Sequence, residues 1–331
     1  VMDRAVVSLL PVMLLLAVLL ALDSYKLVKL RAVAGAVACG ALVAALMVPV
    51  NGLLLDMLRM SVTPFSRFVA PVTEELLKAS VIVALLRTRR IGFLVDAAIY
   101  GFAVGTGFAL AENAYYLRLL QDASPGTWVV RGFGTALMHG GATAIFAMTA
   151  LALVERRASP RALFPGLLLA IALHAGFNQF LLSPRASTVG IVAALPPIFY
   201  AVFAFSERSV SEWLGKGFDA DAAMLELINS GQFAGSPAGR YLQALKGRFE
   251  GPVAADLLCY LRLYTELSLR AKGILLMREH GFHASVDAAT RETFAEMRYL
   301  ERSIGRTGVL AIQPMLGMRQ RDLWQLYMLG K

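Results

Sequence analysis

The stretch Pro71-Val-Thr-Glu-Glu-Leu-Leu-Lys78 places two adjacent carboxylates, Glu74 and Glu75, within a long apolar segment of the chain. An ionisable side chain at bilayer depth costs at least about 2.5 kcal/mol on insertion scales, so it normally faces a wet cavity or a charged partner. Lys78 follows Glu74 by four residues and Glu75 by three, so on a helix it can reach either carboxylate. The stretch therefore predicts a functional site inside a membrane-spanning bundle.

The composition is that of an integral membrane protein. Of 331 residues, 57% are hydrophobic and 17% are charged, against about 25% charged in a soluble domain, and the mean hydropathy is +0.62. Long apolar runs stop near Phe205, and the remainder has the amphipathic periodicity of helices. We therefore expect an all-α protein, with a transmembrane domain over residues 1–206, which contains the predicted site, and a soluble, all-helical cytoplasmic domain over residues 207–331.

A membrane-spanning helix takes roughly 17 to 25 residues, and seven apolar segments are long enough. They cover approximately residues 5–22, 32–55, 66–86, 91–119, 132–154, 162–182 and 187–206. Basic clusters follow the first, third and fifth segments, and the positive-inside rule places these clusters in the cytoplasm. The clusters are Lys26, Lys29 and Arg31; Arg87, Arg89 and Arg90; and Arg156, Arg157 and Arg161. The N-terminus is then expected outside and the C-terminal domain inside.

The positive charge of the chain follows the same pattern. Residues 1–206 contain 16 Lys/Arg against 9 Asp/Glu, which accounts for most of the net charge of +9. This excess belongs to membrane loops, so the charge indicates the lipid bilayer as a partner and does not indicate a nucleic acid.

Pro71 bears on where the helix that carries Glu74 and Glu75 begins. Proline is disfavoured inside a helix but suits its first turn, so we expect a helix to begin at depth near Pro71. Residues 57–70 would then be a re-entrant or interfacial lead-in. Adjacent helical residues point about 100° apart, so only one of Glu74 and Glu75 can aim directly into a cavity, while the other pairs with Lys78.

Polar side chains recur at similar depth on four of the predicted segments. They are Glu74, Glu75 and Lys78 on the third, Glu112 and Asn113 on the fourth, His139 on the fifth, and His174 and Asn178 on the sixth. At 1.5 Å per residue, Glu74 and His174 lie roughly 20 Å from the cytoplasmic face. The polar groups thus converge between the midplane and the outer leaflet.

These groups are the ones needed to hydrolyse an amide. A carboxylate removes a proton from water, a second group protonates the leaving amine, and Asn or His donors stabilise the oxyanion. The sequence has no serine in a nucleophile elbow and no cysteine beside a histidine. Water is therefore the expected nucleophile, activated by a glutamate or by a metal ion.

In chain order, the patterns Pro-x-x-Glu-Glu-x-x-Lys, Phe-x-x-x-Glu-Asn, a His and then His-x-x-x-Asn resemble the PrsW family of intramembrane proteases. That family is related to the CAAX-protease and bacteriocin-processing superfamily, also called CPBP or Abi. The resemblance covers roughly residues 60–182. It implies an intramembrane endopeptidase of the bacterial cytoplasmic membrane that cuts membrane-anchored proteins, such as a transmembrane anti-sigma factor, near the outer leaflet.

The analogy with CAAX proteases also implies residue roles. Glu74 takes the water-activating position, while Glu75 and Lys78 support it. His174 and Asn178 match the last motif and would form an oxyanion pair. Glu112, followed by Asn113, stands where the CAAX pattern has a histidine.

Two mechanisms and two other functions stay open. The interpretation we favour from the sequence is a glutamic protease without a cofactor; the alternative is a zinc site built from Glu75 or Glu112 with His139 and His174. A proton-coupled transporter would also carry Glu and His at midplane, although the repeated halves typical of transporters are not seen in the sequence. A non-catalytic membrane scaffold is the last alternative. The sequence indicates neither the substrate nor the oligomeric state.

Overall fold

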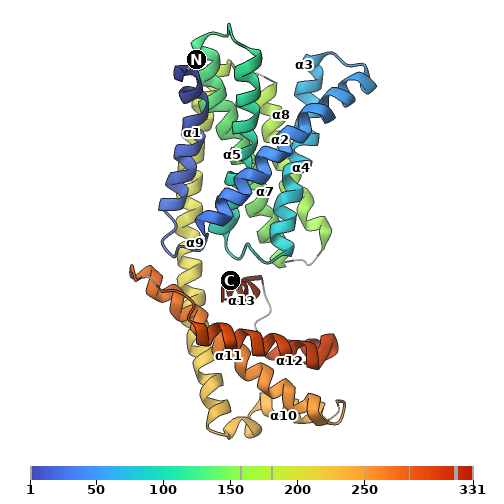
Figure 1. Ribbon diagram of the computed structural model, residues 1–331, viewed down its shortest axis with the longest axis vertical. Coiled ribbons are helices and arrows are strands. Elements are labelled where there is room, and N and C mark those ends of the chain that lie inside the picture. The colour runs from blue at the N-terminus through green and yellow to red at the C-terminus, as the bar shows by residue number, and fades with distance from the viewer. Residues whose placement is uncertain are drawn as a thin grey trace. The chain divides into compact units, whose positions relative to one another are not determined.

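The computed structural model describes residues 2–156, 159–179, 182–249, 251–282, 284–316 and 320–329. Over these ranges the chain is helical and contains no strand, which confirms the predicted all-α class. The chain divides into two compact units, Val1–Ser206 and Glu207–Lys331. Figure 1 shows the helices of each unit.

The first unit is a bundle of long apolar helices connected by short helical turns. Its elements are α1 (Met2–Ala21), α2 (Leu30–Leu58), α3 (Val62–Pro64), the π-helical η1 (Phe65–Val69), α4 (Ala70–Arg87), α5 (Leu94–Leu119), α6 (Pro125–Val129), the π-helical η2 (Val130–Ala136), α7 (Leu137–Arg156), the 3-10 turn η3 (Pro160–Leu163), α8 (Phe164–Asn178) and α9 (Pro184–Asn229), which continues past Ser206.

Among the described residues, six helical segments are long and apolar enough to cross a membrane. These are Met2–Ala21, Leu30–Leu58, Leu94–Leu119, Pro125–Glu155, Pro160–Asn178 and Pro184–Asn229. They confirm that the protein is a polytopic helical membrane protein, and they match six of the seven segments expected from the sequence.

The seventh expected segment, residues 66–86, falls on η1 and α4. The 18 residues of α4 carry four charged side chains, so α4 is not apolar enough to count among the six candidate membrane-spanning segments. Three of the four are nevertheless buried, with exposed fractions of 7% for Glu74, 2% for Glu75 and 0% for Lys78. They are covered because α4 packs against α2, α5, α7 and α8.

The expected start of an α-helix near Pro71 agrees with α4, which begins at Ala70 and has Pro71 in its first turn. The sequence did not indicate that other helical turns lead directly into it. Helical turns resume at Val62, after Arg59 has capped α2 in the left-handed conformation at φ 50°, and they run through η1 into α4. A proline in this position leaves the carbonyl of Arg67 without its usual N–H donor. Side chains at the C-terminal end of α8 bond the carbonyls of this turn: Asn178 Nδ2 donates to the Ser66 carbonyl at 2.9 Å, and Gln179 Nε2 to the Arg67 carbonyl at 3.5 Å.

Helix α5 is the central element of the first unit, because α2 and α7 both pack along it. Small residues permit this close approach. A Cβ atom on Gly40 of α2 would lie 2.0 Å from the carbonyl oxygen of Val104, and one on Gly105 of α5 would lie 2.3 Å from the carbonyl oxygen of His139. The backbone contact at Gly105 brings the polar residues of α7 next to those of α5.

The second unit is also helical in its described part. Besides the end of α9 it contains η4 (Gln232–Gly235), α10 (Pro237–Lys246), α11 (Gly251–Glu279), α12 (Ala288–Ile312), η5 (Gln313–Met315) and α13 (Gln320–Leu329). Helix α11 packs against α10, α12 and α13. Lys272 is buried on α11, where it pairs with Asp221 and donates to Ser268 Oγ at 3.0 Å.

The contact at Gly40 predicts a large difference between two glycines of the same helix. Gly40→Ala would press a methyl group onto the backbone of α5, and we expect the free energy of unfolding to fall by about 1–3 kcal/mol. Gly35→Ala serves as the matched control, since a Cβ there meets no atom within 4 Å and alanine favours the helix by up to about 1 kcal/mol. Unfolding in mixed detergent micelles measures both; equal stabilities would contradict the packing described here.

Candidate active site

Glu75 and Lys78 form an ion pair in the interior of the first unit. Lys78 Nζ lies 2.5 Å from Glu75 Oε1, and both side chains are almost completely buried. The two residues are one helical turn apart on α4, so the pair forms as soon as that helix is made. The ammonium also lies 4.8 Å from the centroid of the Phe108 ring on α5, which adds a cation–π contact.

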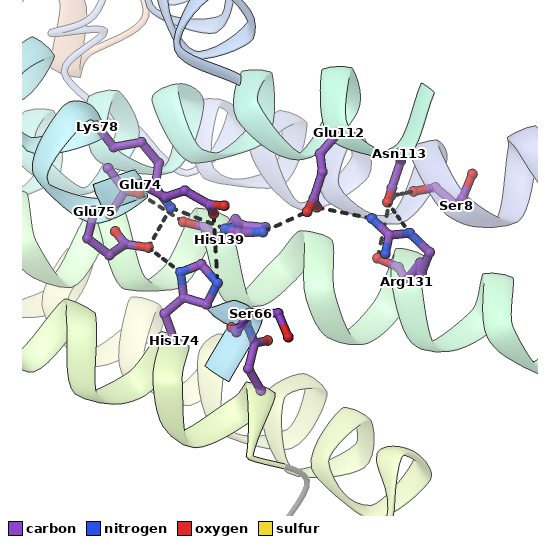
Figure 2. A network of polar contacts seen from close by, with 12 residues as sticks. Ser8, Ser66, Glu74, Glu75, Lys78, Glu112, Asn113, Arg131, His139 and His174 are labelled. Atoms are coloured by element: carbon purple, nitrogen blue, oxygen red, sulfur yellow. Dashed lines mark hydrogen bonds and ion pairs between the residues drawn. The ribbon is translucent and has the colours of Figure 1, made fainter. Parts of the chain in front are cut away.

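Glu75 in turn fixes the orientation of His174 on α8. His174 Nδ1 lies 2.8 Å from Glu75 Oε1. An ionised carboxylate only accepts hydrogen bonds, so Nδ1 carries the hydrogen and, in the neutral ring, Nε2 keeps its lone pair. That Nε2 atom lies 3.9 Å from Glu74 Oε2. Glu75 therefore fixes the imidazole through Nδ1, while Nε2 on the opposite side of the ring faces Glu74 (Figure 2).

His139 on α7 lies between Lys78 and Glu112. Its Nδ1 is 3.1 Å from Lys78 Nζ and its Nε2 is 3.4 Å from Glu112 Oε2. The ammonium can only donate, so Nδ1 accepts and Nε2 carries the hydrogen toward Glu112. The rings of His139 and His174 stand at 87° with centroids 4.7 Å apart.

Beyond His139, the polar contacts continue toward α1 through Glu112 and Arg131. Arg131 on η2 donates from a terminal nitrogen to Glu112 Oε2 at 3.1 Å and from Nε to Asn113 Oδ1 at 2.9 Å. Asn113 donates to the Ser8 carbonyl at 2.8 Å. The Arg131 guanidinium also stacks 3.9 Å from the centroid of the Tyr116 ring. Figure 2 shows this line of side chains extending from Glu75 to Ser8.

The structure brings most of the predicted site residues into one network. Its members are Glu74, Glu75, Lys78, Glu112, Asn113, His139 and His174. Asn178 is engaged elsewhere, because its amide donates to the Ser66 carbonyl. Its expected role as an oxyanion donor beside His174 stays a prediction, as do the catalytic roles of the other residues.

Two residues of this network were not found from the sequence. Asn51 on α2 donates to Glu74 Oε1 at 3.2 Å, and Arg131 binds Glu112 and Asn113. Asn51 is an amide in an otherwise apolar segment, and this was the signal available in the sequence. Arg131 resembles an ordinary loop cation because it falls at the end of an expected outer loop.

The arrangement fits a catalytic zinc ion. Donor atoms of Glu74, His139 and His174 all lie within 4.8 Å of one another, and all three residues are buried. Two imidazoles and one carboxylate are a ligand set of catalytic zinc sites that leave one position for water. His139 would bind the metal ion through the lone pair of its Nδ1 atom. In the structure this lone pair faces the Lys78 ammonium, whose place the metal ion would take.

This ligand set differs from the one expected from the sequence, which paired the two histidines with Glu75 or Glu112. Glu75 already accepts from Lys78 and His174, and Glu112 is bound to Arg131. Glu74 remains as the carboxylate facing the histidines.

The fold and this site agree with a comparison against known protein families. A family model described as PrsW family intramembrane metalloprotease matches residues 29–205. The chain belongs to this family. No curated protein and no solved structure gives a match.

Membership of the PrsW family makes the protein a membrane-embedded peptidase. The expected absence of a cofactor is not supported, because the family is described as a metalloprotease and the structure contains a Glu/His/His cluster. The preference for a glutamic mechanism is likewise not confirmed.

The buried ion pair of this PrsW protein predicts a large effect of removing Lys78. Lys78→Met would leave Glu75 charged and buried, so we expect the free energy of unfolding to fall by about 3–5 kcal/mol. Replacing both residues, as in Glu75→Gln with Lys78→Met, is expected to recover much of this loss. Unfolding in mixed micelles provides the measurement.

Lys216→Met is the matched control, since Lys216 pairs with Glu212 at 3.7 Å while exposed to solvent. An exposed pair contributes within about 1 kcal/mol. If Lys78→Met costs no more than this control, Glu75 is not held as an uncompensated charge.

Proposed function

We propose that this PrsW-family protein is a zinc-dependent intramembrane endopeptidase in which Glu74, His139 and His174 are the metal ligands. The proposal rests on the donor atoms of these three residues lying within 4.8 Å of one another inside a membrane bundle. Zinc, when bound, supplies Lewis acidity that polarises a carbonyl group and makes water a stronger nucleophile.

Glu75 and Lys78 prepare His174 for this role. Because Glu75 accepts the hydrogen of Nδ1, the opposite nitrogen of the ring points toward Glu74. Histidine ligands in metal sites commonly donate their second N–H to a carboxylate, which fixes the tautomer and raises the basicity of the ring. Lys78 balances the charge of Glu75 at 2.5 Å, so this carboxylate stays ionised in the interior.

Glu112 is the carboxylate we propose as the general base and acid. Its side chain is 23% exposed, against 9% for Glu74 and 1% for Glu75. It is thus the member of the cluster that water and a leaving amine reach most easily. Arg131 holds one of its oxygens, Oε2, which also faces His139 Nε2.

A metal-free glutamic mechanism is the second candidate, and one observation favours it. Among the described residues, Glu74 forms no ion pair with a lysine or arginine, and its Oε2 faces the lone pair side of His174 at 3.9 Å. Glu74 would then remove a proton from water directly, as the likeness to CAAX proteases implies.

We further propose that the substrates are membrane-anchored proteins, such as an anti-sigma factor, cut near the outer leaflet. The Glu112–Arg131–Asn113 branch leads toward Ser8 on α1. The start of α1 in turn contacts the loop after α5, where the Arg4 guanidinium bonds the Gln121 carbonyl. With the basic clusters in the cytoplasm, this end of the bundle is the extracytoplasmic one.

Cleavage of a panel of single-span substrates by the purified protein in detergent tests the mechanism. We expect Glu74→Gln to lower the rate at least about 100-fold, as loss of an essential site carboxylate does. A strong chelator should abolish cleavage, and added zinc should restore it. Glu212→Gln is the matched control, since Glu212 is an exposed carboxylate paired with Lys216.

Cleavage that survives chelation but is lost in Glu74→Gln would replace the zinc mechanism with the glutamic one. Cleavage unaffected by both treatments would contradict the site itself.

The proposed orientation predicts which cysteines react from outside the cell. Cys259 is exposed and lies in the second unit. In a Cys39→Ser background, a membrane-impermeant thiol reagent should therefore label Cys259 only after the cells are permeabilised. A cysteine at position 122, made by Asp122→Cys in a chain without Cys39 and Cys259, provides the control and should react in intact cells. The opposite pattern would invert the topology.

A further inference from the structure

Asn51 is a polar side chain on α2 that contacts the site from outside the sequence motifs. Its Nδ2 lies 3.2 Å from Glu74 Oε1, and its Oδ1 lies 3.3 Å from the hydroxyl of Thr73, the neighbour of Glu74. A carboxamide in an apolar membrane segment carries a desolvation cost unless it is hydrogen-bonded. These contacts give the amide its partners and connect α2 to the first turn of α4.

The chemistry of its neighbours fixes the orientation of the Asn51 amide. An ionised carboxylate has no hydrogen to donate, so it is the NH₂ end of the amide that faces Glu74. The carbonyl end then faces the Thr73 hydroxyl, which also has the carbonyl oxygens of Val69 and Ala70 within reach. Asn51 is therefore a hydrogen-bond donor to Glu74 Oε1.

The three carboxylates of the cluster differ in the charge of their partners. Glu75 is paired with the ammonium of Lys78, and Glu112 with the guanidinium of Arg131. In the part of the chain that the structure describes, Glu74 receives its hydrogen bond from the neutral amide of Asn51. Its orientation is thus fixed without a lysine or arginine paired with it.

The two oxygens of Glu74 consequently have different surroundings. Oε1 accepts from Asn51, and Oε2 faces His174 Nε2 at 3.9 Å. A carboxylate held in this way presents one oxygen toward the histidines. Carboxylate ligands of metal sites are themselves commonly hydrogen-bonded, and loss of such a partner typically weakens metal affinity 10–100-fold.

We propose that Asn51 is a positioning residue for Glu74: it holds Oε1 so that Oε2 is directed at the metal position, and it leaves the charge of the carboxylate available to the cation. This inference rests on the zinc site proposed above. It assigns to α2 a part in the site that the motifs on α4, α5, α7 and α8 do not cover.

The test is a zinc titration of the full-length protein in detergent, in competition with a chromophoric chelator. Asn51→Leu keeps the branched shape of the side chain and suits an apolar helix but removes the donor, and we expect the zinc dissociation constant to rise about 10–100-fold. Glu74→Gln, which removes the proposed ligand, should weaken binding at least as much. Leu53→Ala is the matched control on α2, because Leu53 is 62% exposed.

The variants separate failure of this inference from failure of the zinc site. If Glu74→Gln loses zinc but Asn51→Leu binds it like the wild type, Asn51 does not position Glu74, although the site stands. If Glu74→Gln binds zinc as tightly as the wild type, the zinc site fails and the inference with it. Thermal unfolding of the zinc-free forms is compared in parallel, and Asn51→Ala replaces Asn51→Leu should the latter not fold.

Discussion

The buried ion pair between Lys78 and Glu75 is the interaction on which the site depends. Two charges withdrawn from water at this depth are tolerated only when their remaining hydrogen-bonding groups are also satisfied. Lys78 therefore also contacts His139 and the face of Phe108, and Glu75 also binds His174. Satisfying one pair on α4 thus determines the orientation of imidazoles on two other helices. The contacts that offset the electrostatic cost of burying these charges are therefore the same ones that orient the site histidines.

These contacts require that the helices approach closely, and the backbone of α5 provides for this. Glycines on α2 and α5 bring main chains together where any side chain would overlap with a carbonyl group. Short side chains such as those of Asn51 and Asn113 can then bridge neighbouring helices. In a membrane, where helices gain little from burying apolar surface against one another, close packing and polar contacts between helices replace the hydrophobic driving force.

Most of the cluster could be predicted from the sequence because ionisable residues in apolar segments are costly and therefore informative. Glu74, Glu75, Lys78, Glu112, His139 and His174 were all identified in this way. Asn51 and Arg131 were missed, since one amide in a span and one cation near a loop are ordinary residues until their partners are known. The helical turns that precede Pro71 were not predicted, because carbonyls near the proline are bonded from the end of α8, a tertiary contact that no local pattern contains. Which glutamate pairs with Lys78 and which faces His174 Nε2 also depends on the rotation of α4, and only packing sets that rotation.

The π-helical turn at Phe65–Val69 has a consequence for that rotation. A π turn accommodates one residue more than an α-helical turn, so it acts as a single-residue insertion within a continuous helix. One residue corresponds to about 100° around the helix axis, which is the angle separating Glu74 from Glu75. The turn therefore sets the rotation of α4 relative to α3. In a helix of unbroken α-helical phase from Val62 onward, Glu74 would point where Glu75 points now, and Glu75 would point where Leu76 does. The π-helical turn, bonded by Asn178 and Gln179, therefore determines which glutamate pairs with Lys78 and which one faces His174 Nε2.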